Sequence, residues 1–162
     1  MGPSWVTVVI VRDDLLDRAS AEVPAVFNYR LQADADSMLN TPATYNWYLL
    51  GLVLQWLKAQ GGVAAMEQLN IRKAQKLYQA IDASSLYANK VDTRYRSRMN
   101  IPFVLADSSL DKLFLAEAEQ QGLSGLQGHR MTGGMRASIY NAMPEAGIDA
   151  LIEFMAEFER RH

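Results

Sequence analysis

The chain has 162 residues, of which 49% are hydrophobic and 21% are charged, a balance typical of a globular protein. This length suits one domain, or one domain with part of a second, and is enough to bury a hydrophobic core. The net charge of −2 provides no basic stripe, so we expect no nucleic-acid partner. The absence of cysteine excludes disulfides and thiolate metal sites and fits a reducing cytoplasm.

The apolar segments bear on location in the cell. The longest apolar run, around Trp47–Leu57, falls well short of the roughly 20 residues that cross a bilayer. We therefore expect a buried helix there and no membrane partner. The N-terminus has no charged region followed by an apolar block and a cleavage site, so a cytoplasmic protein is expected.

Residues 5–12 (WVTVVIVR) form a continuous run rich in β-branched side chains. Such a run predicts a strand buried on both faces, as in a mainly parallel sheet. A fully buried strand needs neighbours on both sides, and nothing precedes this one. We therefore expect an interior strand whose partners lie outside the chain, followed by an irregular stretch at residues 19–39.

The triplet Asn40-Thr41-Pro42 is a helix-start signal, because Thr41 can cap and Pro42 suits the first helical turn. The helix is predicted to continue to about Ala59 and to end at Gly61-Gly62. A second helix is predicted from Val63 to Ile81. Its expected buried face consists of Ala65, Leu69, Ala74, Leu77 and Ile81.

The segment from Ser97 onward predicts a compact two-layer α/β unit of the order β-α-β-β-α. The first strand covers residues 99–105, where Pro102 favours an edge position or a bulge. A helix capped by Ser108 or Ser109 then reaches Gln121, and short strands follow at 123–126 and 136–140. Pro144 opens a last helix with apolar positions at helical spacing, which are Ile148, Leu151, Ile152, Met155 and Phe158.

The most unusual stretch is GHRMTGGMR at residues 128–136, which combines a histidine, two arginines and three glycines. The planar fork of arginine matches carboxylate and phosphate, and glycines let backbone N–H groups approach an anion. The functional interpretation is an anion-binding loop that includes His129, Arg130 and Arg136. A solvated hairpin remains an equally good interpretation, and Arg136 alone could equally form a salt bridge at the rim.

Other polar clusters carry weaker indications. Asn40 and Thr41 are interpreted first as a helix cap, although an exposed helix N-terminus with a hydroxyl group and an amide also binds phosphate. Arg94, Arg96 and Arg98 alternate as one solvated face of a strand would. Two separated histidines and no cysteine predict no metal centre, and no serine lies in a nucleophile-elbow context.

Several segments resemble bacterial phosphoserine aminotransferases, which are class-V, fold-type-I enzymes dependent on pyridoxal phosphate. The similarity covers essentially the whole chain, and GGMRASIYNAMP is its most specific part. The segments that carry it are GPSWVTVVIVRDDLL, SMLNTPATYNWYLLGLVLQWLKAQGGV, SRMNIPFVLADSSLDKLFL, GHRMTGGMRASIYNAMP and FMAEFERRH. The resemblance implies an α/β fold in which residues 1–68 end the large cofactor-binding domain and residues 69–162 form the small C-terminal domain.

The resemblance also implies an activity and its partners. Family members act as homodimers and transfer the amino group of glutamate to 3-phosphohydroxypyruvate, giving phosphoserine and 2-oxoglutarate. In many bacteria they serve pyridoxine biosynthesis as well as serine biosynthesis. The expected ligands are therefore pyridoxal 5'-phosphate and small anionic substrates, namely glutamate, phosphoserine and phosphorylated 2-oxo acids.

The same resemblance implies roles for individual residues. Arg136 corresponds to the clamp on the substrate α-carboxylate, and His129 and Arg130 correspond to receivers of the distal phosphate or carboxylate. Asn40 and Thr41 resemble the pair that reaches the cofactor phosphate of the other subunit.

The catalytic lysine of the family has no counterpart in this chain. The resemblance places the lysine that forms the Schiff base immediately before Gly2, upstream of Met1, so no catalytic residue is assigned. Trp5 stands where relatives usually carry glycine. The chain is therefore expected to be the C-terminal part of the enzyme, inactive alone. The alternative is a non-catalytic domain that binds phosphorylated acids or dimerises with an aminotransferase subunit.

Overall fold

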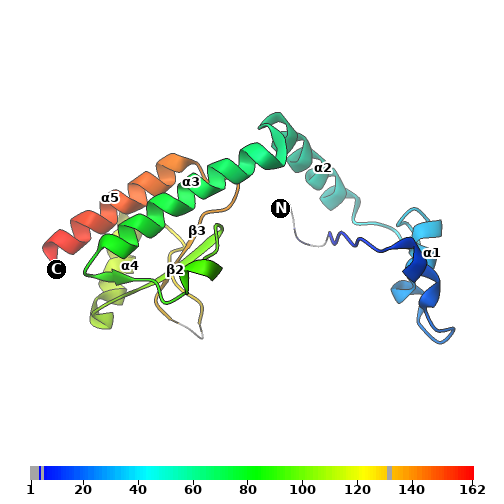
Figure 1. The fold of residues 1–162 in the computed structure, drawn as a ribbon, viewed down its shortest axis with the longest axis horizontal. Helices are drawn as coiled ribbons and strands as arrows, with labels where there is room; N and C mark the ends of the chain where they lie inside the picture. Colours follow the sequence, from blue (N-terminus) through cyan, green and yellow to red (C-terminus); the bar gives the residue numbers. More distant parts are fainter. Residues whose placement is uncertain (1–3, 5, 131–132) are drawn as a thin grey trace. The chain divides into compact units, whose positions relative to one another are not determined.

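The computed structural model describes Ser4, residues 6–130 and residues 133–162, and these form two compact units (Figure 1). The first unit comprises residues 1–62 and the second comprises residues 63–162. The boundary predicted at residues 68 and 69 separates a large from a small domain, and it stays a prediction.

The first unit consists of short helical elements and one longer helix. Two 3-10 helices, η1 (Asp13–Arg18) and η2 (Ala25–Phe27), precede the short helix α1 (Tyr29–Asp34). The predicted irregular stretch thus contains α1, because the side chain of Asn28 accepts hydrogen bonds from the first N–H groups of that helix. The longer helix α2 (Thr44–Ala59) ends before Gly61, which has φ +94°, as the sequence predicts.

The β-branched run near the N-terminus is extended but unpaired. Residues 6–12 form no ladder with any described residue, and Val8 and Ile10 are 75% and 94% exposed. The prediction of a strand buried on both faces is therefore wrong for these residues, while Trp5 lies outside the described residues. The β-branched side chains favour an extended backbone, but a strand also requires a neighbour that exchanges hydrogen bonds with it.

The second unit is built on helix α3 (Gly62–Ala83), which begins close to the predicted start. Ala74, Leu77 and Ile81 are buried as predicted, but Met66 is buried in place of Ala65, and Leu69 is only partly buried. The stripe consists of Met66, Asn70, Lys73, Ala74, Leu77, Tyr78 and Ile81. Two polar residues therefore lie on a face that the apolar pattern alone would not assign to them.

A three-stranded antiparallel sheet packs against the helices of this unit. The strands β1 (Tyr87–Ala88), β2 (Asn100–Leu105) and β3 (Met135–Ser138) lie in the order β1-β2-β3. Alternate residues of β2 and β3 are buried, which places the hydrophobic core on one face of the sheet. The two-layer α/β architecture predicted from the sequence is confirmed.

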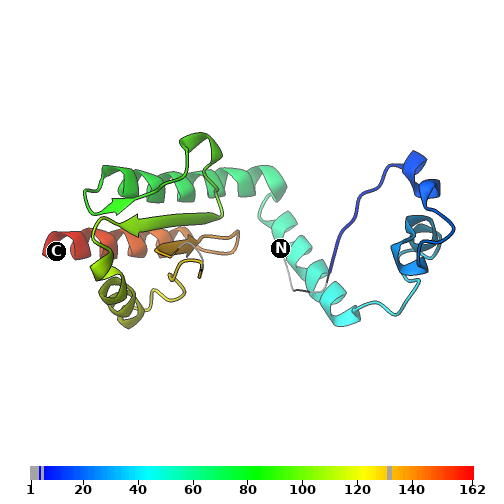
Figure 2. The same ribbon diagram turned by 90° about the horizontal axis from the view of Figure 1, so that it is seen from below.

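Helices α4 (Asp111–Gln120) and α5 (Glu145–Arg161) complete the second unit. Figures 1 and 2 both show α3 and α5 running side by side. The Lys76 ammonium joins them through Glu145 at 3.0 Å and Asp149 at 2.8 Å. Phe114 of α4 is fully buried among the aromatic rings of Tyr87, Phe103, Phe154 and Phe158.

Pro102 lies in the middle strand of the sheet, which differs from the predicted edge position. It stands opposite Arg136 in the register of β2 and β3, while β1 pairs only with Val104 and Leu105. The N–H of Arg136 points away from β2, to the carbonyl oxygen of Leu126 at 2.8 Å. Pro102 and Arg136 therefore form a non-hydrogen-bonded pair, so the ladder with β3 loses nothing at the proline.

Two local predictions for this unit need correction. The strand expected at residues 123–126 is reduced to a single bridge between Gln127 and Met135, so the second strand of the predicted β-α-β-β-α order is missing and β1 is additional. The N-cap of α4 is Leu110, and the side-chain cap lies one turn earlier at Asp107, whose carboxylate accepts from the N–H of Ser109 at the start of a 3-10 turn, η4 (Ser108–Leu110). A carboxylate at this position satisfies a free N–H as well as the predicted serine would.

Candidate anion-binding site

Residues 128–134 form a loop that is closed by its own backbone. The N–H of Gly128 donates to the carbonyl oxygen of Gly134 at 2.9 Å, and the N–H of Gly133 donates to that of His129 at 2.8 Å. Gly133 and Gly134 have φ values of +67° and +64°, which favour glycine. Met131 and Thr132 lie outside the described residues. The three glycines of the motif thus serve the closure of the loop.

Two of these glycines also permit close backbone contacts. A Cβ on Gly128 would overlap the carbonyl oxygen of Gly133 and lie 2.6 Å from that of Gly134. A Cβ on Gly134 would lie 2.8 Å from the carbonyl oxygen of Phe103 and 2.9 Å from Cγ1 of Val104. The loop is therefore held against strand β2 at a distance that only glycine allows.

Arg136 projects from the start of β3, directly after this loop. The residue is half-buried, and its Nε is buried with no hydrogen-bond partner among the described residues. No ion pair of Arg136 occurs within the described part of the chain, so the alternative of a rim salt bridge is not realised there. A buried donor without a partner costs roughly 1–3 kcal/mol, which a bound anion would offset.

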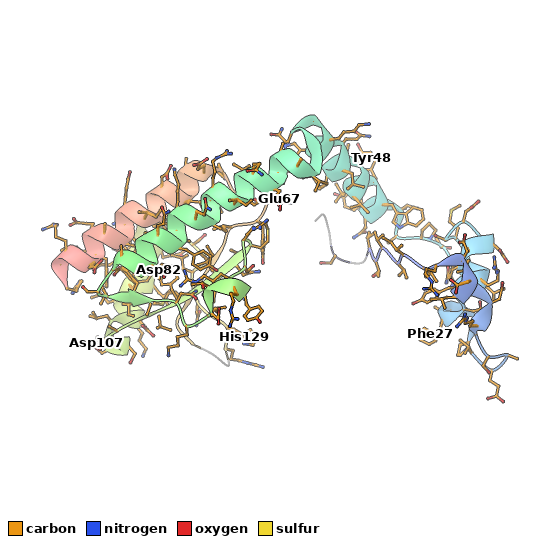
Figure 3. The ribbon with its side chains drawn as sticks, viewed as in Figure 1. Phe27, Tyr48, Glu67, Asp82, Asp107 and His129 are labelled. Carbon is orange, nitrogen blue, oxygen red and sulfur yellow. The ribbon has the colours of Figure 1, made fainter. Side chains whose placement is uncertain are left out.

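His129 and Arg130 lie on the same loop, and both side chains are exposed. Figure 3 shows the His129 side chain at the lower edge of the second unit. The structure therefore brings His129, Arg130 and Arg136 together on one glycine-closed segment and the strand that follows it. Cationic and imidazole groups at such a place can receive a carboxylate or a phosphate.

Asn40 and Thr41 belong to the first unit and are exposed. The prediction that Thr41 caps the helix is wrong, because α2 begins at Thr44 with Ala43 as its N-cap, and no side chain bonds there. Thr41 and Pro42 therefore both precede the helix. The N-cap residue Ala43 thus offers no side-chain acceptor to the first N–H groups of α2.

The structure reveals a buried cation that the sequence did not indicate. Lys73 on α3 is fully buried, and its ammonium donates to the carbonyl oxygens of Ile139, Tyr140 and Met143 at 3.3, 2.8 and 3.0 Å. Burial lowers the pKa of Lys73, and the more distant charge of Glu145 opposes this shift only partly. Its position on the apolar stripe of α3 was the available signal.

The solvated face predicted for three arginines applies to only part of the set. The guanidinium of Arg96 lies 4.6 Å from the ring centroid of Tyr78 and binds both carboxylate oxygens of Asp82. Its hydrogen bonds lower the pKa of Asp82. Arg94 and Arg98 are exposed and pair with Asp92 and Glu67. Arg96 thus packs against Tyr78 and Asp82 of α3 and does not face solvent.

Among the described residues, no group of three histidine, aspartate or glutamate side chains is placed to hold a metal ion. No single helix of the described chain is long and apolar enough to cross a membrane, although α2 and α3 would pass that test if counted together.

The fold and the loop define an α/β protein with a buried, unpartnered arginine nitrogen beside a glycine-closed loop. The family model described as "Aminotransferase class-V" matches residues 1–151, so the chain belongs to the class-V aminotransferase family. It is 60% identical over 162 residues to the phosphoserine aminotransferase of Marinomonas sp. (strain MWYL1) and covers 45% of that protein. The resemblance seen in the sequence is confirmed.

Solved structures give the same result. A phosphoserine aminotransferase examined for radiation damage of its Schiff base is 44% identical, with a TM-score of 0.95, over 99% of this chain and 45% of that one. The phosphoserine aminotransferase of Trichomonas vaginalis, solved with pyridoxal phosphate bound, is 38% identical with a TM-score of 0.84, over 90% and 42% respectively. The chain thus spans somewhat less than half the length of these relatives, and pyridoxal phosphate is the cofactor of the family.

Proposed function

We propose that this chain is the C-terminal part of a phosphoserine aminotransferase, which transfers the amino group of glutamate to 3-phosphohydroxypyruvate. The products are 2-oxoglutarate and phosphoserine, and the pathways served are serine and pyridoxine biosynthesis. The observation that carries the proposal is the buried, unpartnered Nε of Arg136 beside a loop closed by glycines. Identity of 60% to a phosphoserine aminotransferase supports the choice of substrate.

Arg136 is proposed to bind the substrate α-carboxylate. A guanidinium offers two parallel N–H groups to the two oxygens of a carboxylate, which fixes the orientation of the substrate as well as its position. The exposed side chains of His129 and Arg130 receive the distal group, which is a phosphate in phosphoserine and a carboxylate in glutamate. One loop thereby accepts both substrates through charge that is common to them.

Asn40 and Thr41 are proposed to bind the phosphate of pyridoxal phosphate across a homodimer. The exposed Thr41 hydroxyl and the uncapped N-terminus of α2 fit a phosphate group. When bound, the cofactor supplies an electron sink for the bond changes at the substrate α-carbon. This chain then binds the anionic groups of the cofactor and the substrates. The enzyme is cytoplasmic in this proposal, its large domain ends at residue 68, and its small domain covers residues 69–162.

The lysine that would hold the cofactor is placed by the resemblance before Gly2, so the 162-residue chain is expected to lack transaminase activity. The alternative function is a non-catalytic domain that binds phosphorylated acids or pairs with an aminotransferase subunit. The closure of the 128–134 loop entirely within the second unit favours retained binding.

Calorimetric titration of the chain with O-phospho-L-serine tests the anion site. We expect saturable binding, weakened about tenfold in Arg136→Lys because an ammonium cannot form the paired fork. Arg94→Lys, at an exposed arginine paired with Asp92, is the matched control and should bind as the unmodified chain does. Equal affinity of Arg136→Lys and the unmodified chain would contradict the role of Arg136.

The same preparation tests activity. The chain mixed with pyridoxal phosphate, glutamate and 3-phosphohydroxypyruvate should form no phosphoserine, and borohydride should trap no lysine adduct. Turnover together with a trapped adduct would show that a lysine within residues 1–162 serves the cofactor. Binding without turnover supports either a separated C-terminal part or the alternative binding domain, and addition of the lysine-bearing part distinguishes them by restoring activity only in the first case.

A further inference from the structure

Lys73 is a fully buried cation for which the proposed substrate chemistry has no use. Its Nζ lies 2.8 Å from the carbonyl oxygen of Tyr140, 3.0 Å from that of Met143 and 3.3 Å from that of Ile139. An ammonium has three protons and no acceptor, so these three carbonyls match its capacity completely. The ammonium of Lys73 therefore has all its hydrogen bonds within the protein and needs no ligand.

No carboxylate of a described residue contacts the ammonium of Lys73. Nearby Glu145 forms its ion pairs with Arg72 and Lys76, at 3.7 and 3.0 Å. Burial of an ammonium without a contacting counter-charge is unfavourable unless its hydrogen bonds compensate for the lost water. An apolar side chain of similar volume would fill the same space without this penalty, so packing alone does not account for a lysine here.

The three carbonyls belong to the corner that joins β3 to α5. Within this corner the N–H of Met143 donates to the carbonyl oxygen of Tyr140 at 2.9 Å, which closes a turn. Asn70, which precedes Lys73 on the same face of α3, donates through its Nδ2 to Oδ1 of Asn141 at 2.8 Å. Two polar side chains of α3 thus hold one short turn of the neighbouring segment.

This corner follows the C-terminal end of β3, which is paired with β2 and carries Arg136. The buried Nε of Arg136 has no partner among the described residues, so no hydrogen bond of its own there fixes the guanidinium. Its position must follow from the backbone of the strand. The loop between Gly128 and Gly134 holds the N-terminal end of β3, and Lys73 holds the C-terminal end at Ile139.

We propose that Lys73 is a positioning residue for Arg136, holding the end of β3 so that the guanidinium fork meets the substrate carboxylate. The inference rests on the proposed function, which assigns carboxylate binding to Arg136. Ligand-binding groups need placement within about 0.5 Å, and a strand anchored at both ends provides it without any hydrogen bond at the arginine head. Lys73 itself touches neither substrate nor cofactor in this arrangement.

Nuclear magnetic resonance of the 162-residue chain tests the proposal through the Nε–Hε signal of Arg136, which reports directly on the side chain. In Lys73→Met we expect this signal to shift and its order parameter to fall, while core amides of α4 and α5 stay unchanged. Titration with L-glutamate should show affinity reduced about tenfold, because one of the two charge-assisted hydrogen bonds between Arg136 and the carboxylate is lost. Lys76→Met, an exposed lysine on the same helix, should change neither readout.

A second variant covers the case in which Lys73→Met fails to fold. Asn70→Ala removes one hydrogen bond to the same corner and should move the Arg136 signal in the same direction by a smaller amount. An Arg136 signal and a glutamate affinity that are unchanged in folded Lys73→Met, or in Asn70→Ala if only that variant folds, would overturn the proposal. Absence of glutamate binding by the unmodified chain would instead count against the proposed function, and the Arg136 signal would still decide the role of Lys73.

Discussion

The Nε of Arg136 combines burial with the absence of a partner among the described residues, and on this combination we propose Arg136 as an anion-binding residue. Several exposed arginines are paired with carboxylates, as Arg94 is with Asp92 and Arg98 with Glu67. The Nε of Arg136 is buried yet lacks an acceptor among the described residues. Because a buried unpaired donor is unfavourable, the site gains free energy when a carboxylate binds.

Gly128 allows a sharp test of the loop closure. Substitution of Gly128 by alanine puts a methyl group onto the carbonyl oxygens of Gly133 and Gly134, so the loop must open. We expect the free energy of unfolding to fall by about 1–3 kcal/mol and phosphoserine affinity to fall with it. Urea denaturation and calorimetry measure the two effects.

The matched control for this change is Gly51→Ala. Gly51 lies within α2, and a Cβ there meets no atom within 4 Å. Alanine is the better helix former, so Gly51→Ala should leave the stability unchanged or raise it by up to about 1 kcal/mol. A Gly128→Ala variant as stable as the unmodified chain would show that the loop tolerates a different closure.

The sequence predicts the local chemistry of single residues but not the contacts between distant segments. The motif GHRMTGGMR predicted an anion-binding loop from composition, because glycine and arginine have well-defined tasks near anions. The contact between Gly134 and the backbone of Phe103 could not be predicted, since it joins segments that are distant in the chain. Lys73 was missed for the same reason, because its three acceptors lie more than 60 residues away, at separations of 66, 67 and 70.

At the scale of elements, the second unit is held together by side chains that bond the backbone of a neighbouring segment. Lys73 on α3 does this for the corner before α5, and Glu159 on α5 does it for the turn after α3. The Glu159 carboxylate accepts from the N–H groups of Ser85 and Leu86, at 2.8 and 3.2 Å, and from the Ser85 hydroxyl at 3.0 Å. Each of these two helices thus forms hydrogen bonds to the backbone of the segment next to the other helix.

Glu159 gives this unit a predictable dependence on pH. Burial tends to raise the pKa of Glu159, but its hydrogen bonds to residues 84–86 outweigh burial, so the folded-state pKa is lowered. A lowered folded-state pKa adds stability above the unfolded-state value, and this stability is lost as pH falls through the folded-state pKa. The contribution of Glu159 should therefore be full at pH 7 and vanish in acid.

Glu159→Gln measures that contribution. The variant should be about 1 kcal/mol less stable than the unmodified chain at pH 7, and the difference should shrink toward zero as the pH falls through the lowered folded-state pKa of Glu159. Urea unfolding at several pH values provides the comparison. Glu153→Gln is a suitable control on the exposed face of α5. A difference that stays constant with pH would show that the loss comes from packing.

Element boundaries were predictable where local chemistry determines them. Positive φ at Gly122 ends α4, and Pro144 precedes α5, both as the sequence indicates. The prediction of a strand at residues 123–126 was wrong. Its pairing depends on how far this segment runs beside β3, and only Gln127 forms a bridge, with Met135. Pro102 was placed at an edge because sequence alone cannot show which side of a middle strand is left unpaired.

At the scale of the whole molecule, the hydrophobic core belongs to one unit. Every side chain of the core cluster lies between Ala74 and Phe158, in the second unit. Among the described residues of the first unit no side chain is buried, and large apolar groups such as Val8 and Ile10 are exposed. The apolar content of the sequence is similar in both halves, so composition alone did not predict this division.

This asymmetry predicts that residues 63–162 fold without the first unit. A chain of about 100 residues with one closed core is large enough to be stable alone, whereas the first unit buries too little apolar surface to offset the entropy of ordering its backbone. Hydrogen exchange of the 162-residue chain should therefore protect backbone amides of α3, α4 and α5 and leave those of residues 6–43 fast. Expressed separately, residues 63–162 should unfold cooperatively with a Tm within a few degrees of the transition that the longer chain shows. Two results would contradict this prediction: unfolding of residues 63–162 alone that is not cooperative, or slow exchange of the amides throughout residues 6–43. Either result would show that the first unit buries apolar side chains and contributes to the core.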